Sequence, residues 1–218
     1  MKTITAIEEQ KNNSRRVNIY LDDEFAFGLA RMTAAWLKVG QRIDERKLQE
    51  LLAEEAREKA YQQAMIFLSF RARSESEIRK NLTKHEIPAD VQDATIQRLR
   101  QERLVNDEEF AQAWVANRSE FRPRSRRALT VELKRKGLGE SAIQSATEAV
   151  DEEAMAYAAA QKQVRRLSQL DWKTFREKLS AFLARRGFSY ETIAPTVKRV
   201  WSELGGSKQN EFDDEEQP

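Results

Sequence analysis

The strongest chemical signal in this 218-residue sequence is a cluster of positive charge between residues 118 and 136. Eight cations accompany two carboxylates, Glu120 and Glu132, which leaves a local excess of six positive charges. The cations are Arg118, Arg122, Arg124, Arg126, Arg127, Lys134, Arg135 and Lys136. Like charges repel one another, so their clustering favours a binding role toward phosphates or acidic protein surface. For any single cation, a solvated helix face is the simpler interpretation.

A second group of cations follows between residues 162 and 186, where eight cations face Asp171 and Glu177. On stacked helical repeats, cations from successive repeats line up along one face. We therefore expect both groups to contribute to one docking surface for an acidic protein or a polyanion. From the second group we assign to this surface Arg165, Arg166, Lys173, Arg176, Arg185 and Arg186.

Groups that catalyse reactions are scarce. The sequence contains no cysteine, which excludes disulfides, thiol nucleophiles and cysteine-based metal sites. The single histidine, His85, aligns with Lys136 and Arg186 near predicted helix ends, so we expect it to cap a helix C-terminus. No histidine-based catalytic triad emerges, and we predict a protein without enzymatic activity.

Two acidic runs and one glycine-rich stretch also have structural explanations. The runs 22–24 and 107–109 could hold Mg²⁺, as in a nuclease, but a turn and a helix cap explain them. The stretch 205–208 (GGSK) lacks the strand and helix of a phosphate-binding loop and reads as a linker. We therefore expect no metal and no cofactor.

Composition indicates a folded, mainly α-helical protein. Charged residues make up 34% of the chain and hydrophobic residues 40%, with only four prolines. The net charge of +2 does not by itself argue for a polyanionic partner. Charges interrupt every apolar run before it reaches about 18 residues, so we expect no signal peptide, no membrane contact and a cytoplasmic location.

The elements that position the cations emerge from an internal repeat. Residues 78–87, 129–138 and 179–188 share one apolar spacing, and their central leucines, Leu82, Leu133 and Leu183, lie 51 and 50 residues apart. This spacing is typical of the buried stripe of a helix, and the glycines at 137 and 187 are typical of its C-terminal turn. In the first repeat Glu86 replaces the glycine, so we expect that helix to end differently, ahead of Pro88.

Caps and strand patterns complete the predicted organisation. Ser74–Glu77 and Asn106–Glu109 indicate helix starts, and residues 3–7, 17–21 and 24–27 indicate a three-stranded meander covered by a helix at about 29–38. We predict three tandem three-helix repeats that form an elongated body behind a small β-containing domain. The predicted parts are a meander plus helix at 1–43, a linking helix with repeat one at 44–104, repeat two at 105–150, repeat three at 151–204 and a disordered acidic tail at 205–218.

Three segments resemble the RecX family of regulatory proteins. Leu104–Ala111 resembles the family's Leu-x-x-Asp-x-x-Phe-Ala segment, and Glu132–Leu138 resembles its Glu-Leu-x-x-Lys-Gly-Ile segment. Arg73–Ile78 resembles the start of the first repeat. Their order and spacing cover most of 58–204. One departure is the segment Phe121–Ser125, where the family often has a glycine, so we expect a stiffer loop.

This resemblance implies a regulator of the recombinase RecA. Family members bind RecA–DNA filaments in their helical groove and limit homologous recombination, DNA repair activity and ATP turnover in the SOS response. The resemblance therefore implies a RecA nucleoprotein filament as partner, with weak, sequence-independent contact to DNA. We expect a monomer.

Two alternatives from other classes stay open. A three-helix unit with a basic element also presents recognition helices in helix-turn-helix DNA-binding proteins, although Ser141–Val150 carries few base-reading side chains. A carboxylate metal nuclease is the second alternative, which an assay with Mg²⁺ and DNA would test. Strong preference for one duplex sequence would favour the first alternative over a RecA regulator.

Overall fold

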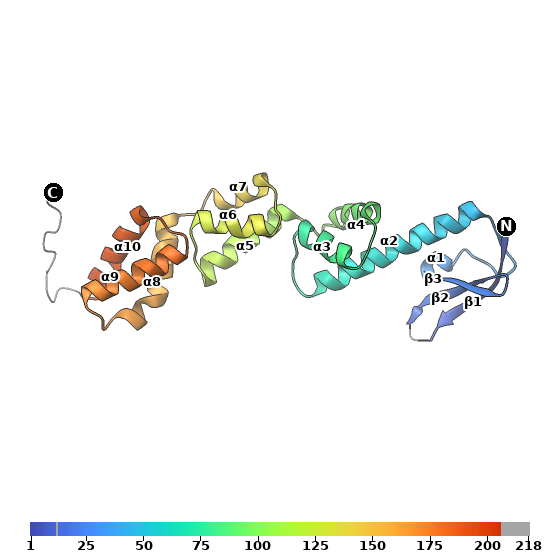
Figure 1. Ribbon diagram of the computed structural model, residues 1–218, viewed down its shortest axis with the longest axis horizontal. Coiled ribbons are helices and arrows are strands. Elements are labelled where there is room, and N and C mark those ends of the chain that lie inside the picture. Colours follow the sequence, from blue (N-terminus) through green and yellow to red (C-terminus); the bar gives the residue numbers. More distant parts are fainter. Residues whose placement is uncertain (12, 206–218) are drawn as a thin grey trace. The chain divides into compact units, whose positions relative to one another are not determined.

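The computed structural model describes residues 1–11 and 13–205, and the chain divides into two compact units. The first unit comprises residues 1–105 and the second begins at Asn106. Both are mainly helical, and the first also carries a small sheet, which confirms the predicted fold class (Figure 1). The acidic tail predicted at 205–218 lies outside the described residues, apart from Gly205.

The sheet of the first unit has four antiparallel strands in the order β3-β2-β1-β4. They are β1 (Lys2–Gln10), β2 (Asn13–Leu21), β3 (Glu24–Ala30) and β4 (Arg42–Ile43). Alternate residues of β2, Val17, Ile19 and Leu21, are buried, which is the pattern of a sheet with one covered face.

Two details of this domain differ from the prediction. The two-residue strand β4 pairs with Lys2 and Thr3, and a strand this short has too few residues to show an alternating pattern. The helix expected at 29–38 is the four-residue α1 (Arg31–Ala34), because β3 continues to Ala30. The sheet is instead covered mainly by residues further along the chain.

The long helix α2 (Glu45–Ser69) joins the sheet to the first repeat. Its Leu51 belongs to the core of the sheet, whereas its second half belongs to the core of the first repeat. Between them, the buried carboxylate of Glu55 accepts hydrogen bonds from Arg16 of β2 and from the backbone N–H of Ala30. Because an unpaired buried carboxylate is costly, this pairing favours one position of the sheet on α2, which also contributes Leu51 to the core of the sheet.

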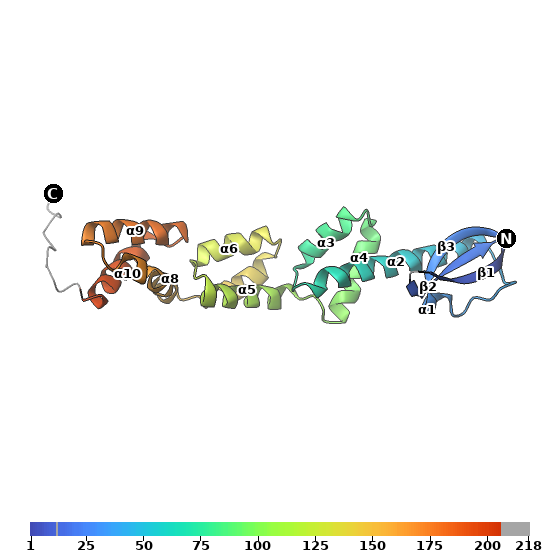
Figure 2. The same ribbon diagram turned by 90° about the horizontal axis from the view of Figure 1, so that it is seen from below.

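Three three-helix repeats follow, as the leucine spacing predicts, and residues 58–204, all described, contain no strand. Repeat one combines the second half of α2 with α3 (Glu75–Lys84) and α4 (Ala89–Gln101). Repeat two contains α5 (Asp107–Phe121), α6 (Arg126–Arg135) and α7 (Glu140–Thr147), and repeat three contains α8 (Glu152–Leu167), α9 (Trp172–Arg185) and α10 (Tyr190–Glu203) (Figure 2). Repeats two and three share one hydrophobic core, so the second unit is a single packed body.

The middle helix of each repeat ends in the same hydrogen-bonded turn. The central leucines Leu82, Leu133 and Leu183 are 0% exposed, and their carbonyls accept from the N–H of Ile87, Leu138 and Phe188 at 3.1, 3.3 and 3.3 Å. The residue before each donor has a left-handed backbone, with φ of 58° at Glu86, 79° at Gly137 and 90° at Gly187. The same residue position therefore anchors the core and ends the helix.

Our expectation that α3 ends differently because Glu86 lacks a glycine's freedom is wrong. Glu86 adopts the left-handed conformation, which costs about 1–2 kcal/mol for a residue with a side chain. Its N–H donates to the carbonyl of Thr83 at 2.9 Å, as the N–H groups of Gly137 and Gly187 do in their turns. The turn hydrogen bonds and the buried leucine offset the local cost.

Leu133→Ala should destabilise the second unit by about 2–5 kcal/mol, because it removes buried methyl groups and leaves a cavity. Val131→Ala is the matched control on the same helix, because Val131 is 42% exposed and should cost about 1 kcal/mol or less. Urea denaturation of the full chain measures both. Equal losses for the two variants would contradict the repeat alignment.

Candidate functional site

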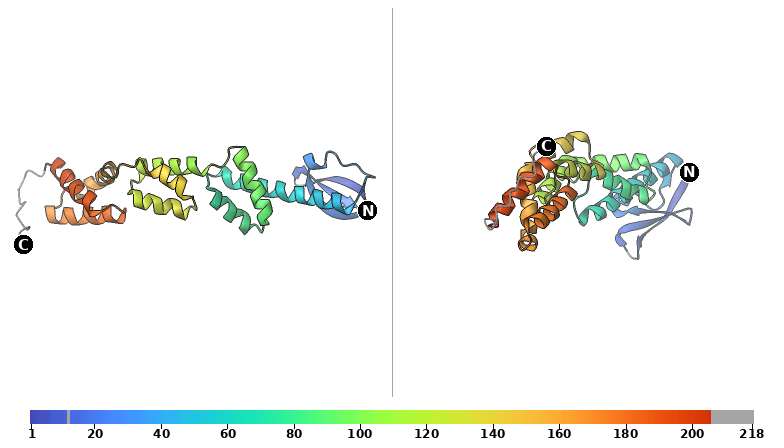
Figure 3. Two further views of the ribbon diagram at one scale, coloured as in Figure 1. Left: turned by 90° about the horizontal axis from the view of Figure 1, so that it is seen from above. Right: turned by 60° about the vertical axis from the view of Figure 1, so that its left-hand side comes forward.

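Repeats two and three meet at a seam, which we define as residues 121–128 together with Arg186 and Gly187. The backbone N–H of Ser125 donates to the carbonyl of Arg186 at 3.2 Å. A Cβ atom on Gly187 would lie 2.6 Å from Ser125 Oγ, so only glycine permits this approach. The end of α9 and the start of α6 consequently lie close together, and the two helices meet end to end in Figures 2 and 3.

Glu132 on α6 is the carboxylate that organises the cations of repeat two. Its Oε2 atom accepts from Trp114 Nε1 and from Arg118 Nε, each at 2.8 Å. Its Oε1 atom forms an ion pair with Arg124 Nε at 2.9 Å. Burial raises the pKa of Glu132, but hydrogen bonds from Arg118 and Trp114 and the charges of Arg118 and Arg124 lower it by more, so this pKa lies below its ordinary value of 4.5.

Two further cations donate to backbone carbonyls near the boundary between the repeats. The guanidinium of Arg126 donates to the carbonyl of Val150 at 2.8 Å, and its backbone N–H donates to Glu152 Oε1 at 2.6 Å. Lys162 Nζ on α8 donates to the carbonyl of Phe121 at 3.0 Å, near the end of α5. The backbone N–H of Arg126 and the side chain of Lys162 thus connect repeat two with repeat three, whereas the guanidinium of Arg126 holds the end of repeat two.

Arg186 lies beside the loop that carries Arg122 and Arg124. Its Nη1 atom donates to the carbonyl of Pro123 at 3.1 Å, and its guanidinium carbon lies 4.4 Å from the centre of the Phe182 ring. Burial, followed by the charges of Arg124 and Arg122, lowers the pKa of Arg186 below its ordinary value. The end of α9 therefore places a desolvated cation next to two others.

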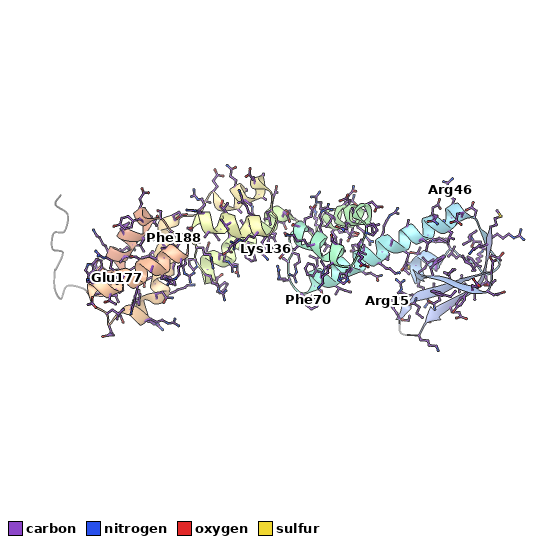
Figure 4. All side chains as sticks on the ribbon, in the orientation of Figure 1. Arg15, Arg46, Phe70, Lys136, Glu177 and Phe188 are labelled. Carbon is purple, nitrogen blue, oxygen red and sulfur yellow. The ribbon has the colours of Figure 1, made fainter. Side chains whose placement is uncertain are left out.

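The structure separates the fourteen predicted site residues into two sets. Seven have contacts with neighbouring side chains or carbonyls: Arg118, Arg124, Arg126, Lys134, Lys136, Arg176 and Arg186. Lys136, labelled in Figure 4, lies 4.9 Å from the Trp114 ring centre. The other seven are exposed, and their side chains form no hydrogen bond or ion pair with any described residue. They are Arg122, Arg127, Arg135, Arg165, Arg166, Lys173 and Arg185.

Sequence reasoning missed the residues that pair with these cations. Glu132 was counted only as a negative charge, Lys162 only as a cation and Gly187 only as part of a helix-ending turn, and Trp114 was not identified as a partner of Glu132. Their contacts join residues that are distant in the chain, so charge counting within one segment cannot find them. The only sequence signal for these contacts was the glycine that recurs at the end of the middle helix in repeats two and three.

The groups considered for catalysis occupy structural positions. The backbone N–H of His85 donates to the carbonyls of Asn81 and Leu82, and its Nε2 atom lies 2.9 Å from the amide of Gln63. The predicted capping is thus made by the backbone, and the ring faces α2. Among the described residues, no group of three or more histidine or acidic side chains could hold a metal ion.

The acidic runs at 22–24 and 107–109 form a turn between strands and the first turn of a helix. Asp22 and Asp23 have left-handed backbones between β2 and β3, and Asp22 Oδ1 accepts from the N–H of Thr3 at 2.9 Å. Residues 107–109 form the first turn of α5, where Asn106 Oδ1 accepts from the N–H groups of Glu108 and Glu109. In the part of the chain that is described, no helix is long and apolar enough to cross a membrane.

Four family models match the chain along most of its length. They are the regulatory protein RecX N-terminal domain at residues 2–44, and the first, second and third RecX three-helix domains at 60–99, 106–146 and 151–195. These matches follow the sheet domain and the three repeats in chain order.

Relatives and solved structures agree with these matches. The regulatory protein RecX of Bacillus pumilus is 34% identical over 216 residues, covering 97% of this chain and 82% of the relative. That of Geobacillus thermodenitrificans is 36% identical over 206 residues, covering 89% and 76%. A crystal structure of regulatory protein RecX has a TM-score of 0.68 and 26% identity, covering 94% of this chain and all of that one. RecX from Lactobacillus salivarius, at 21% identity and a TM-score of 0.59, covers 67% and 97% and shares the fold.

Glu132→Gln should lower the free energy of unfolding at pH 7 by about 1–3 kcal/mol, because it removes a charge that accepts several hydrogen bonds. The pKa of Glu132 is lowered on folding, so its stabilising effect is present above 4.5 and disappears as the pH falls through the folded-state pKa. The gap between wild type and variant should therefore shrink between pH 7 and pH 3.

Urea denaturation at the two pH values measures this gap. Glu120→Gln is the matched control, because Glu120 is exposed and its side chain has no partner among the described residues. A gap at pH 3 as large as that at pH 7 would show that Glu132 acts by shape rather than by charge.

Proposed function

The chain belongs to the RecX family of regulatory proteins, and from this we propose that it regulates the recombinase RecA without catalysing a reaction. It binds RecA–DNA filaments in their groove and thereby limits recombination, DNA repair activity and ATP turnover. It acts in the cytoplasm as a monomer, with weak, sequence-independent contact to DNA. The observation that carries the proposal is the set of exposed cations on repeats two and three.

These cations are available to a partner because the fold does not use them. Arg127 and Arg135 lie on the exposed side of α6, whereas Leu129 and Leu133 of the same helix are fully buried. On α9, Lys173 and Arg185 are exposed in the same way around the buried Leu179. Each of these helices thus anchors itself by one stripe and presents positive charge on another. A RecA–DNA filament, with its phosphates, suits such a surface.

The arrangement supports binding more than chemistry. The single histidine lies beside an amide, and the acidic runs serve a turn and a helix cap. The helix that follows the glycine turn of repeat two, α7, has the sequence ESAIQSAT and contains no arginine, lysine or asparagine. This composition argues against α7 as a helix that reads bases in the major groove.

The rate of RecA ATP hydrolysis on single-stranded DNA, with and without this protein, tests the proposal. Wild type should lower the rate, and added salt should weaken the effect, because exposed charges are screened over about 8–10 Å at physiological ionic strength. Arg127→Glu combined with Arg135→Glu should raise the concentration needed for half-maximal inhibition by about tenfold or more. We replace only these residues because Arg124 and Arg126 also hold the seam together.

The matched control combines Lys178→Glu with Lys198→Glu. Both lysines are exposed in repeat three and lie outside the predicted docking surface, and the change in charge is the same. The control should inhibit within about twofold of wild type. An unchanged RecA rate with wild type at every concentration would overturn the proposed regulation. If the arginine variant inhibits as strongly as wild type, the docking surface lies elsewhere on the protein.

A further inference from the structure

Three arginines of the seam lie close together in the fold, because the carbonyl between Arg122 and Arg124 accepts from Arg186, and we call these three the arginine cluster. Arg186 Nη1 donates to the carbonyl of Pro123, which lies between the other two arginines in the chain. The N–H of Ser125 returns a hydrogen bond to the carbonyl of Arg186. Two hydrogen bonds therefore fix the end of α9 against this loop, so the fold places Arg186 beside the backbone that carries Arg122 and Arg124.

The cluster has fewer negative charges than positive ones. In the described chain, the carboxylate paired with it is Glu132, which also accepts from Trp114 and Arg118. The Nε atoms of Arg124 and Arg186 are buried without a hydrogen bond to any described residue, although Arg124 Nε lies 2.9 Å from Glu132 Oε1. Buried donors normally have acceptors, and of these two Nε atoms that of Arg186 has neither a hydrogen bond nor an ion pair with a described residue.

The positive charges of the cluster repel one another. The charges of Arg124 and Arg122 lower the pKa of Arg186, after the larger effect of burial. The ten-residue helix α6 also begins here, so the positive end of its dipole points toward the same place. Glu152 accepts from the first N–H of this helix and offsets part of that field. The positive charges of the three guanidinium groups nevertheless outnumber the negative charges of Glu132 and Glu152, the carboxylates that contact the seam.

We propose that the arginine cluster binds a phosphate group. A phosphate presents several oxygens at once to planar guanidinium groups, which are donors with a fixed fork geometry. Arg122 is exposed, whereas Arg124 pairs with Glu132 and Arg186 donates to the carbonyl of Pro123. On the filament of the proposed function, the phosphate comes from the DNA backbone. That assignment of the source rests on the proposed function, whereas the site itself does not.

The first test measures the melting temperature of the full chain in inorganic phosphate and in chloride at equal ionic strength. Phosphate that binds only the folded state should raise the melting temperature of wild type by a few degrees. Arg122→Gln should melt at or above the wild-type temperature in chloride, because it relieves repulsion, and should lose more than half of the rise in phosphate. Lys198→Gln, an exposed control in the same unit, should keep the full rise.

The second test distinguishes the sources of phosphate and uses an oligothymidylate with no RecA present. If the cluster contacts the nucleic-acid backbone, Arg122→Gln should reduce the slope of log Kd against log salt by about 0.7, and Lys198→Gln should not. A phosphate-dependent rise that requires Arg122, without this change in slope, would assign the site to free phosphate.

Two results would overturn the phosphate site. One is a rise in phosphate that is equal in wild type and Arg122→Gln, which would mark an adventitious ion only. The other is no rise in either protein together with an unchanged salt slope. Neither test contains RecA, so the phosphate site and the regulation of RecA are tested independently. Either proposal can be contradicted while the other is supported.

Discussion

The second unit depends on the way it neutralises buried positive charge. Glu132 gathers Trp114, Arg118 and Arg124 around one carboxylate and so fixes the loop that precedes α6. Onto that loop the end of α9 docks, through the contact of Gly187 with Ser125. If this carboxylate were absent, several cations would be left partly buried and unpaired, which is costly. This arrangement positions the loop on which the end of α9 docks, and the hydrophobic core that the two repeats share completes their packing.

The repeated architecture was predictable from sequence because one residue per repeat has two tasks. Leu82, Leu133 and Leu183 are each buried and each accept the hydrogen bond that ends a helix, so their spacing persists in the chain. The glycine in the turn that ends each of these helices is less informative, because Glu86 adopts the same left-handed backbone in the first repeat. The N-terminal sheet was predicted in outline. Its fourth strand is too short for a pattern, and its first helix is shorter than composition suggests.

The candidate site was predictable only as a region. The sequence locates the cations, but it does not show which of them the fold neutralises, because the partners lie far away in the chain. Arg186 and Pro123 are 63 residues apart, and Lys162 reaches Phe121 across 41 residues. The fold gives the guanidinium of Arg126 a partner in the carbonyl of Val150 and leaves Arg127 without one among the described residues, although the two are neighbours in sequence. The seam divides the basic cluster into cations that hold the unit together and cations that face a partner.

The most direct test of this division is site-specific cross-linking to RecA. The chain contains no cysteine, so one introduced in place of Arg127 or Lys178 is its only thiol and can carry a photo-cross-linker attached before mixing. Both positions are exposed in the second unit, but only Arg127 belongs to the predicted docking surface. With RecA filaments on single-stranded DNA, the probe at 127 should cross-link to RecA or DNA, and the yield should fall with added salt. Equal yields from 127 and 178, or yields that salt does not change, would contradict docking through the exposed cations of α6.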